Sequence, residues 1–121
     1  HALSHITGGG LAANVARVLP SGMHATLERS TWTPPAVFGA VKEWGNVPTA
    51  DVEQTLNMGI GFVAVVPAQQ AAAAVQASAA RGIDAWVLGH VTAAGPEVAD
   101  GTVQGAKGVD GGSVSVVGTH R

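Results

Sequence analysis

The residues best suited to chemistry in this sequence form a glycine-rich segment, Thr7-Gly8-Gly9-Gly10, directly before a helical pattern. Glycine lets successive backbone N–H groups turn toward one point, and a helix start adds unpaired N–H groups and the positive end of its dipole. This arrangement suits a phosphate, and the Thr7 hydroxyl adds a donor. The same glycines equally suit a tight turn that lets the helix pack closely, because the segment matches neither common phosphate-loop pattern.

A second group of candidate site residues lies before and after this loop. His5 directly precedes it, and its imidazole either hydrogen-bonds the loop or a polar ligand, or simply ends a strand. Asn57 stands before the glycine-spaced segment Gly59-Ile60-Gly61, where its amide either meets a ligand or forms a turn. Glycines inside an apolar run indicate close approach of a ligand or another backbone.

The sequence gives little support to metal binding or covalent catalysis. Five histidines are present, but only His1 and His5 are closely spaced, and no carboxylate lies near them. A protein metal site needs three or four ligands. No serine lies in a nucleophile-elbow pattern. We therefore assign no metal ligands and leave the catalytic residues unknown.

Length and charge restrict the possible classes. A chain of 121 residues forms one domain. Its formal charge of −2 and scattered basic residues argue against nucleic-acid binding. The longest apolar run is about half of a membrane span, which argues against a membrane protein. The lack of cysteine fits a reducing compartment, so we expect a cytoplasmic location. Because the chain begins without Met, we expect it to be part of a longer protein.

Hydrophobic periodicity, helix propensity and helix start and stop residues predict the elements that position these residues. The predicted helices span residues 11–19, 35–44, 49–56 and 67–80, and the predicted strands span residues 24–29, 59–66 and 84–93. The strand at 59–66 is nearly continuous in apolar character, which favours burial on both faces. The expected fold is α+β, with helices packed on one face of a mixed sheet of about four strands.

We also predict which side chains form the core and how the chain ends. Seven apolar side chains are expected to be buried: Val15, Leu19, Phe38, Val41, Phe62, Val65 and Trp86. Residues 94–121 form a glycine-rich tail that we expect to be mobile. Within it, residues 113–117 alternate Ser and Val and suit an edge strand.

The motifs together resemble a known family. His5-Ile6-Thr7-Gly8-Gly9-Gly10-Leu11, followed by Asn14 and Arg17-Val18-Leu19-Pro20, is similar to the opening of the C-terminal domain of the aminoimidazole ribonucleotide synthetases, the phosphoribosylformylglycinamidine cyclo-ligases. Further matches follow in the family's order: Trp32, Pro35, Phe38, Gly45-Asn46-Val47, Thr55, Asn57-Met58-Gly59-Ile60-Gly61, Ala85-Trp86 and Gly89-His90-Val91. The resemblance covers residues 1–93, and the tail at 94–121 departs from it.

Four local departures accompany the resemblance. Gln54 and Leu56 stand where the family typically has a basic residue and an aromatic residue. Ala13 and Ala16 replace a usual Glu and Pro in the first helix.

The resemblance implies a cytoplasmic ligase of purine biosynthesis. The family closes the imidazole ring of formylglycinamidine ribonucleotide with ATP and Mg²⁺, which its N-terminal domain mainly binds, and it is expected to be a homodimer at full length. In this reading Thr7, Gly8, Gly9 and Gly10 bind the substrate phosphate, and His5, Asn57, Gly59 and Gly61 line the adjacent wall. The N-terminal domain is absent here, so we expect this chain alone to be inactive.

Two other readings remain open at this stage. One is a related ATP-dependent enzyme, such as a selenophosphate synthetase or a thiamine monophosphate kinase. The other is a phosphate-binding module without catalytic activity.

Overall fold

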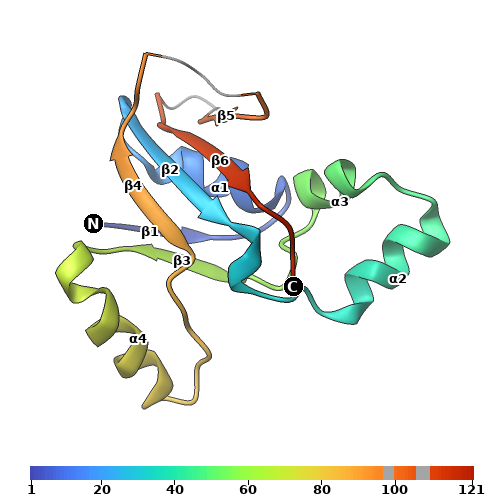
Figure 1. Cartoon of the computed structure of the whole chain (residues 1–121), viewed down its shortest axis with the longest axis horizontal. Helices are drawn as coiled ribbons and strands as arrows, with labels where there is room; N and C mark the ends of the chain where they lie inside the picture. Colours follow the sequence, from blue (N-terminus) through green and yellow to red (C-terminus); the bar gives the residue numbers. More distant parts are fainter. Residues whose placement is uncertain (97–99, 106–109) are drawn as a thin grey trace.

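The computed structural model describes residues 1–96, 100–105 and 110–121. Within them, four α-helices accompany a four-stranded sheet and a two-stranded ribbon (Figure 1). The strands are β1 (Ala2–His5), β2 (Met23–Glu28), β3 (Phe62–Val65), β4 (Gly89–Ala93), β5 (Val103–Gln104) and β6 (Ser113–Val117). The helices are α1 (Gly10–Val18), α2 (Ala36–Gly45), α3 (Thr49–Thr55) and α4 (Ala71–Ala79), with the short 3-10 helices η1 (Arg29–Thr31) and η2 (Ala68–Gln70).

The larger sheet is mixed, as the sequence predicts. Its strand order is β4-β2-β6-β5. Strand β2 pairs antiparallel with β4 and parallel with β6, and β5 pairs antiparallel with β6. This α+β architecture confirms the predicted fold class.

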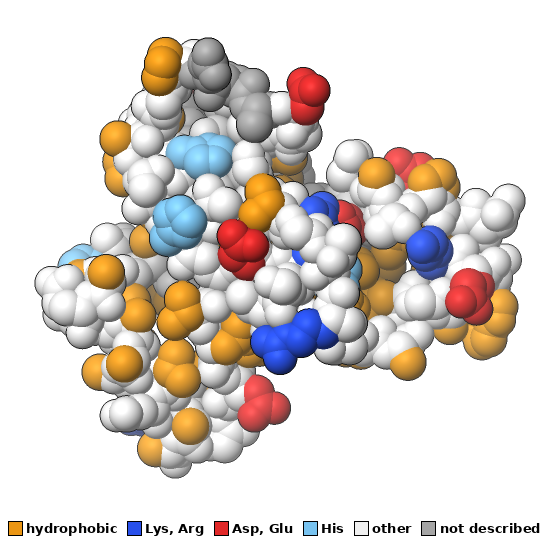
Figure 2. Space-filling view, viewed as in Figure 1, with side chains coloured by type: hydrophobic (Ala, Val, Ile, Leu, Met, Phe, Trp, Pro, Cys, Tyr) orange, Lys and Arg blue, Asp and Glu red, His pale blue; other side chains and the backbone are white. Residues whose placement is uncertain are grey.

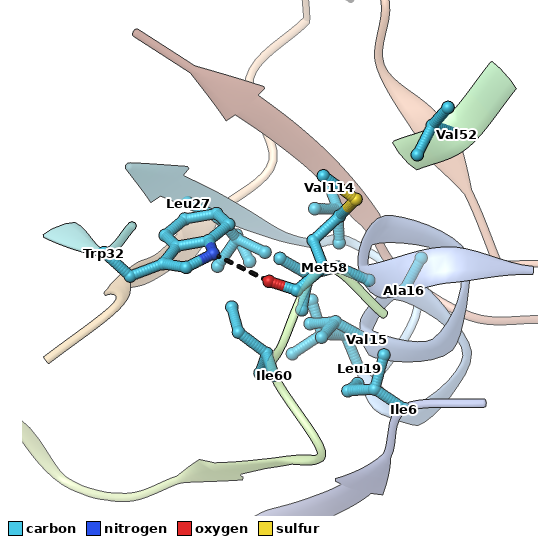
Figure 3. Packing of buried hydrophobic residues seen from close by; sticks show 12 residues of the cluster. Ile6, Val15, Ala16, Leu19, Leu27, Trp32, Val52, Met58, Ile60 and Val114 are labelled. Carbon is cyan, nitrogen blue, oxygen red and sulfur yellow. Dashed lines mark hydrogen bonds between the residues drawn. The ribbon is translucent and has the colours of Figure 1, made fainter. Parts of the chain in front are cut away.

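One helix packs against both sheets. Helix α1 contacts β1 in the ribbon and β5 and β6 in the larger sheet. Val15 on α1 and Val114 on β6 are almost completely buried, and ten further apolar residues surround them (Figure 3). The buried core consists of Ile6, Leu11, Val15, Ala16, Leu19, Ala25, Leu27, Trp32, Val52, Met58, Ile60 and Val114.

The predicted helices are all present, but two predicted strands are shorter than expected. The strand expected at residues 59–66 is β3, Phe62–Val65, and the strand expected at 84–93 is β4, Gly89–Ala93. In place of burial on both faces, β3 pairs only with β1, and Phe62 is 58% exposed. Burial on two faces requires a covering layer on each side, and no residue of α4 is buried against this ribbon.

Burial confirms Val15 and Leu19 and corrects the other predicted core residues. Phe38 and Val65 are only half-buried. The remaining three, Val41, Phe62 and Trp86, are exposed. For Phe38 and Val41 the reason is their helix, because α2 has no buried residue and lies away from the sheet, beside α3 (Figure 1). An apolar periodicity shows which face of a helix is apolar, but not what covers that face.

The described part of the tail is ordered into the sheet. Residues 113–117 form a strand, but the expected edge position is wrong, because β6 lies between β2 and β5. A Cβ at Gly111 would overlap the carbonyl oxygen of Ala16 on α1, and one at Gly112 would crowd the carbonyl oxygen of Met23. These glycines therefore permit close packing, so the expectation of a mobile tail is wrong for β6. The tail residues at 97–99 and 106–109 lie outside the described residues.

No helix within the described residues is long and apolar enough to cross a membrane.

The position of β6 generates a stability prediction. Val114 is fully buried and Val117, on the same strand, is 36% exposed. We expect Val114→Ala to lower the free energy of unfolding by about 1–3 kcal/mol, because it leaves a cavity in the core, and Val117→Ala to change it by less than about 0.5 kcal/mol. Urea denaturation of both variants measures the difference. Equal effects would contradict an interior β6.

Candidate functional site

The glycine loop ends at the start of α1 and is open to solvent. Thr7, Gly8 and Gly9 are exposed, whereas Gly10 is buried. Gly9 is the N-cap of α1 with a φ of 99°, and no side chain within the described residues caps the helix. The first N–H groups of a helix have no partner within it. The loop therefore offers backbone donors and the positive end of the helix dipole to an anion.

Asn14 fixes the shape of this loop from the inside. Its Nδ2 donates to the carbonyl oxygen of Gly10 at 2.7 Å and lies 3.3 Å and 3.4 Å from those of Thr7 and Gly8. Asn14 is almost completely buried, and the hydroxyl of Ser4 donates to its backbone oxygen at 2.9 Å. The side-chain amide of Asn14 thus binds three carbonyl oxygens of the loop from its inner side. The Thr7 hydroxyl lies 3.4 Å from Asn14 Oδ1, a long hydrogen bond.

The three glycines have different roles. A Cβ at Gly10 would overlap the carbonyl oxygen of Glu53, so this glycine lets α3 pack against the first turn of α1. A Cβ at Gly8 would meet nothing within 4 Å, and one at Gly9 would approach side chains only at 3.9 Å or more. Close packing therefore explains Gly10 and does not explain Gly8. The positive φ of Gly9 accounts for glycine at that position.

The segment Asn57–Gly61 is a tight turn. Asn57 Oδ1 accepts a hydrogen bond from the Gly59 N–H at 3.0 Å, and the Ile60 N–H donates to the Asn57 carbonyl at 3.0 Å. The Asn57 amide therefore forms the turn that the sequence left as one of two alternatives. A Cβ at Gly59 would overlap the ring of Pro35, so protein packs at this glycine, whereas Gly61 faces open space.

The fold brings these two segments together. The Ile6 N–H donates to the Gly61 carbonyl at 3.0 Å, which places the end of β1 beside the turn. His5 pairs with Phe62 across the ribbon, and their rings stack with centroids 6.0 Å apart. No hydrogen bond within the described residues joins the His5 ring to the loop. The predicted site residues are thus neighbours, but His5 lies on the outer face of the ribbon.

A charged cluster lies behind the loop and was not predicted from the sequence. Glu53 on α3 accepts two hydrogen bonds from the Arg29 guanidinium, at 2.9 Å and 2.7 Å. These hydrogen bonds hold the pKa of the Glu53 carboxyl below its ordinary value, against the opposing effect of burial, and His120 adds a smaller effect in the same direction. The same ion pair raises the pKa of Arg29.

Sequence patterns gave only partial signals for these supporting residues. Asn14 belongs to the motif that carries the family resemblance, and its position four residues after Gly10 is the one sequence signal for its contact with the loop. Glu53 lies 24 residues from Arg29 and 67 residues from His120 in the sequence. No local sequence pattern could therefore predict either contact.

Two hollows among the described residues lie apart from the glycine loop. The larger, about 820 Å³, is mainly apolar and lies between α4, the ribbon and residues 83–91. The smaller, about 220 Å³, contains His24 Nδ1 at 2.7 Å from Ser113 Oγ. Residues 7–10 line neither hollow.

Figure 2 shows one face of the molecule, on which acidic, basic and histidine side chains are interspersed with apolar ones. Within the described residues, no three His, Asp or Glu side chains come together in a way that suits a metal ion. The two carboxylate oxygens of Glu53 are already bound to Arg29 and His120.

Comparisons with known proteins agree with the motifs. The family model for AIR synthase related proteins, C-terminal domain, matches residues 1–101. A Streptomyces fradiae protein provisionally named phosphoribosylformylglycinamidine cyclo-ligase is 56% identical over 92 residues, covering 76% of this chain and 50% of that protein. The phosphoribosylformylglycinamidine cyclo-ligase of Anaeromyxobacter dehalogenans strain 2CP-C is 50% identical over 95 residues, covering 78% and 28%. This chain spans half or less of the length of these relatives.

The distinction between Gly10 and Gly8 generates a matched pair of variants. Gly10→Ala places a Cβ against the Glu53 carbonyl at a residue with a φ of 73°, and we expect it to lower the free energy of unfolding by more than about 2 kcal/mol. Gly8→Ala, which meets open space, is expected to change it by less than about 0.5 kcal/mol. Denaturant unfolding is the measurement. A tolerated Gly10→Ala would disprove the close contact between α1 and α3.

The lowered pKa of Glu53 generates a pH prediction. Between the lowered value and the ordinary value of 4.5, the unfolded chain binds a proton at this residue and the folded chain does not. The stabilisation by the ion pair is therefore complete above pH 4.5 and is lost as the pH falls through the folded-state pKa. Glu53→Gln should remove this contribution, so thermal unfolding should depend less steeply on pH below 4.5 in the variant. Identical pH profiles would exclude the effect.

Proposed function

Because this chain belongs to the AIR synthase related proteins and carries their C-terminal domain, we propose that it is part of an ATP-dependent cyclo-ligase. The proposed reaction closes the imidazole ring of formylglycinamidine ribonucleotide in purine biosynthesis. This chain supplies the side of the site that binds the substrate's phosphate. The names of its relatives support the cyclo-ligase reaction, and the geometry of the glycine loop supports the phosphate-binding role.

The observation that carries the proposal is the open backbone at Gly8 and Gly9. Neither glycine is required for packing, and both are exposed directly before an α-helix without a side-chain cap among the described residues. Backbone N–H groups at such a helix start bind phosphate, and a side chain here would keep the phosphate away from them. Thr7, Gly8, Gly9 and Gly10 are the proposed phosphate-binding residues.

The neighbouring turn supports the second half of the site. Gly61 faces open space and lies one hydrogen bond away from Ile6, next to the loop. We assign His5, Asn57, Gly59 and Gly61 to the wall beside the phosphate. Asn57 and Gly59 shape this wall through the turn, because the Asn57 side chain is bonded to the Gly59 N–H.

The chemistry of ring closure assigns a limited role to this chain. ATP phosphorylates the formyl oxygen, the amidine nitrogen attacks the same carbon, and phosphate leaves. The loop orients the substrate through its own 5′-phosphate, which lies away from the reacting carbon. Orientation of this kind lowers the entropic part of the barrier.

ATP and Mg²⁺ belong to the part of the enzyme outside this chain in our proposal. Mg²⁺ prefers carboxylate oxygens and phosphates, and both carboxylate oxygens of Glu53, behind the loop, are already bound to Arg29 and His120. We further propose that the full-length enzyme is cytoplasmic and forms a homodimer. Its ligand in this proposal is a small ribonucleotide. The division into a synthetase domain at residues 1–93 and a tail at 94–121 remains a prediction.

A valine at Gly8 tests the phosphate assignment. In the full-length enzyme, we expect Gly8→Val to weaken formylglycinamidine ribonucleotide binding at least about tenfold, about 1.4 kcal/mol, because the side chain covers the backbone donors. Gly8 is a better position than Gly9 for this test, because the φ of 99° at Gly9 would strain any valine. Calorimetric titration measures the affinity for the ribonucleotide and for ATP.

The control is Gly39→Val, at an exposed helical glycine where a Cβ also meets nothing within 4 Å. We expect this variant to bind both ligands as the unmodified enzyme does. A folded Gly8→Val enzyme with unchanged ribonucleotide affinity would reject the phosphate assignment.

A further inference from the structure

His120, near the C-terminus, contacts the supports of both halves of the candidate site. Its Nε2 lies 3.1 Å from Oε1 of Glu53, behind the glycine loop. Its ring also packs edge-on against Trp32, with centroids 4.6 Å apart and an interplanar angle of 78°. Such aromatic pairs contribute to packing specificity beyond the area they bury.

The first contact leads to the glycine loop. The Glu53 carboxylate binds Arg29 and His120, and its backbone carbonyl packs against Gly10. Arg29 in turn donates to the carbonyl oxygen of Val116 at 2.6 Å and to that of Gly118 at 3.3 Å. Movement of the tail would therefore move α3, and α3 is in backbone contact with the first turn of α1.

The second contact leads to the turn at residues 57–61. Trp32 is 7% exposed, and its Nε1 donates to the carbonyl of Met58 at 3.1 Å (Figure 3). Met58 has a φ of 53°, a conformation that non-glycine residues adopt only when their surroundings hold them in it. The ring of Trp32, which His120 contacts, therefore helps to hold the turn in a strained conformation.

His120 is itself firmly held. The preceding strand β6 is interior to the sheet, and the next residue, Arg121, donates to the backbone carbonyls of Ser30 and Thr31. The His120 side chain is 20% exposed. It lies beyond residue 101, where the family match ends.

We propose that His120 is a positioning residue that couples the glycine loop to the turn at residues 57–61. Through Glu53 and Trp32 it fixes the separation between the phosphate-binding loop and the adjacent wall. The residue does not touch the substrate. The identity of the ligand rests on the proposed function, but the coupling of the two segments does not.

Amide hydrogen exchange in the 121-residue chain tests the coupling directly. The Gly10 N–H, bonded to Thr7, reports on the loop, and the Ile60 N–H, bonded to Asn57, reports on the turn. The Ala94 N–H, bonded to Gly22 in another part of the fold, reports on global opening. We expect His120→Ala to accelerate exchange at Gly10 and Ile60 by about tenfold relative to Ala94. The exposed neighbour Thr119→Ala should change none of the three.

Two further variants separate the two contacts. His120→Gln keeps a donor for Glu53 but loses the aromatic edge, so it should accelerate exchange at Ile60 and spare Gly10. Trp32→Phe removes the hydrogen bond to Met58 and should have the same selective effect. The proposal is wrong if His120→Ala leaves Gly10 or Ile60 unchanged, or if it accelerates Ala94 equally.

Ligand binding in the full-length enzyme distinguishes this proposal from the proposed function. If the unmodified enzyme binds formylglycinamidine ribonucleotide, His120→Ala should weaken binding at least about threefold and leave ATP affinity unchanged. If His120→Ala binds the ribonucleotide as tightly as the unmodified enzyme does, the positioning role is wrong. An unmodified enzyme that does not bind the ribonucleotide would overturn the proposed function, while the exchange experiment would still decide the coupling.

Discussion

The structure depends on backbone contact between α1 and its neighbours on two sides. At its first turn, Gly10 allows the carbonyl of Glu53 to approach, and near its last turn, Gly111 of the tail packs on the carbonyl of Ala16. Neither contact has space for a Cβ. Interiors at this packing density do not absorb even one added methyl group without a shift. The position of α1 is therefore set by main-chain atoms, which explains how a core with few large side chains holds one helix between two sheets.

The fixed main chain around α1 also determines how the candidate site can bind a ligand. Recognition by backbone N–H groups needs a main chain that is both bare and fixed. Gly8 and Gly9 provide the bare surface, and Asn14 fixes the loop by binding its carbonyl groups from below. A buried amide that satisfies several carbonyls is a precise support, because any displacement leaves buried polar atoms without partners. The site thus uses a polar side chain for shape and the main chain for contact.

Local sequence predicted the elements well and their environment poorly. Periodicity located α1 and α2, helix propensity located α4, and the glycine pattern located the loop and the turn, because these features depend on residues close in sequence. Phe62 and Trp86 were expected in the core, but both are exposed. Their burial depends on which elements cover the ribbon and residues 83–91, and periodicity carries no information about that. The glycines of the tail gave a misleading signal, since the same composition suits a mobile chain and a tightly packed one. The ion pair of Arg29 with Glu53 required the tertiary fold, and so did the contact of His120.

The family match ends at residue 101, but the folded unit continues beyond it, because β6 lies inside the sheet. Removal of the chain beyond residue 101 would take away β5 and β6 and leave one side of β2 unpaired. An exposed strand edge of this kind recruits other strands and promotes aggregation. A fragment cut at the end of the family match would therefore be a poor unit for expression or domain fusion. A fragment that extends to Arg121 keeps β5 and β6 and is the better choice for both.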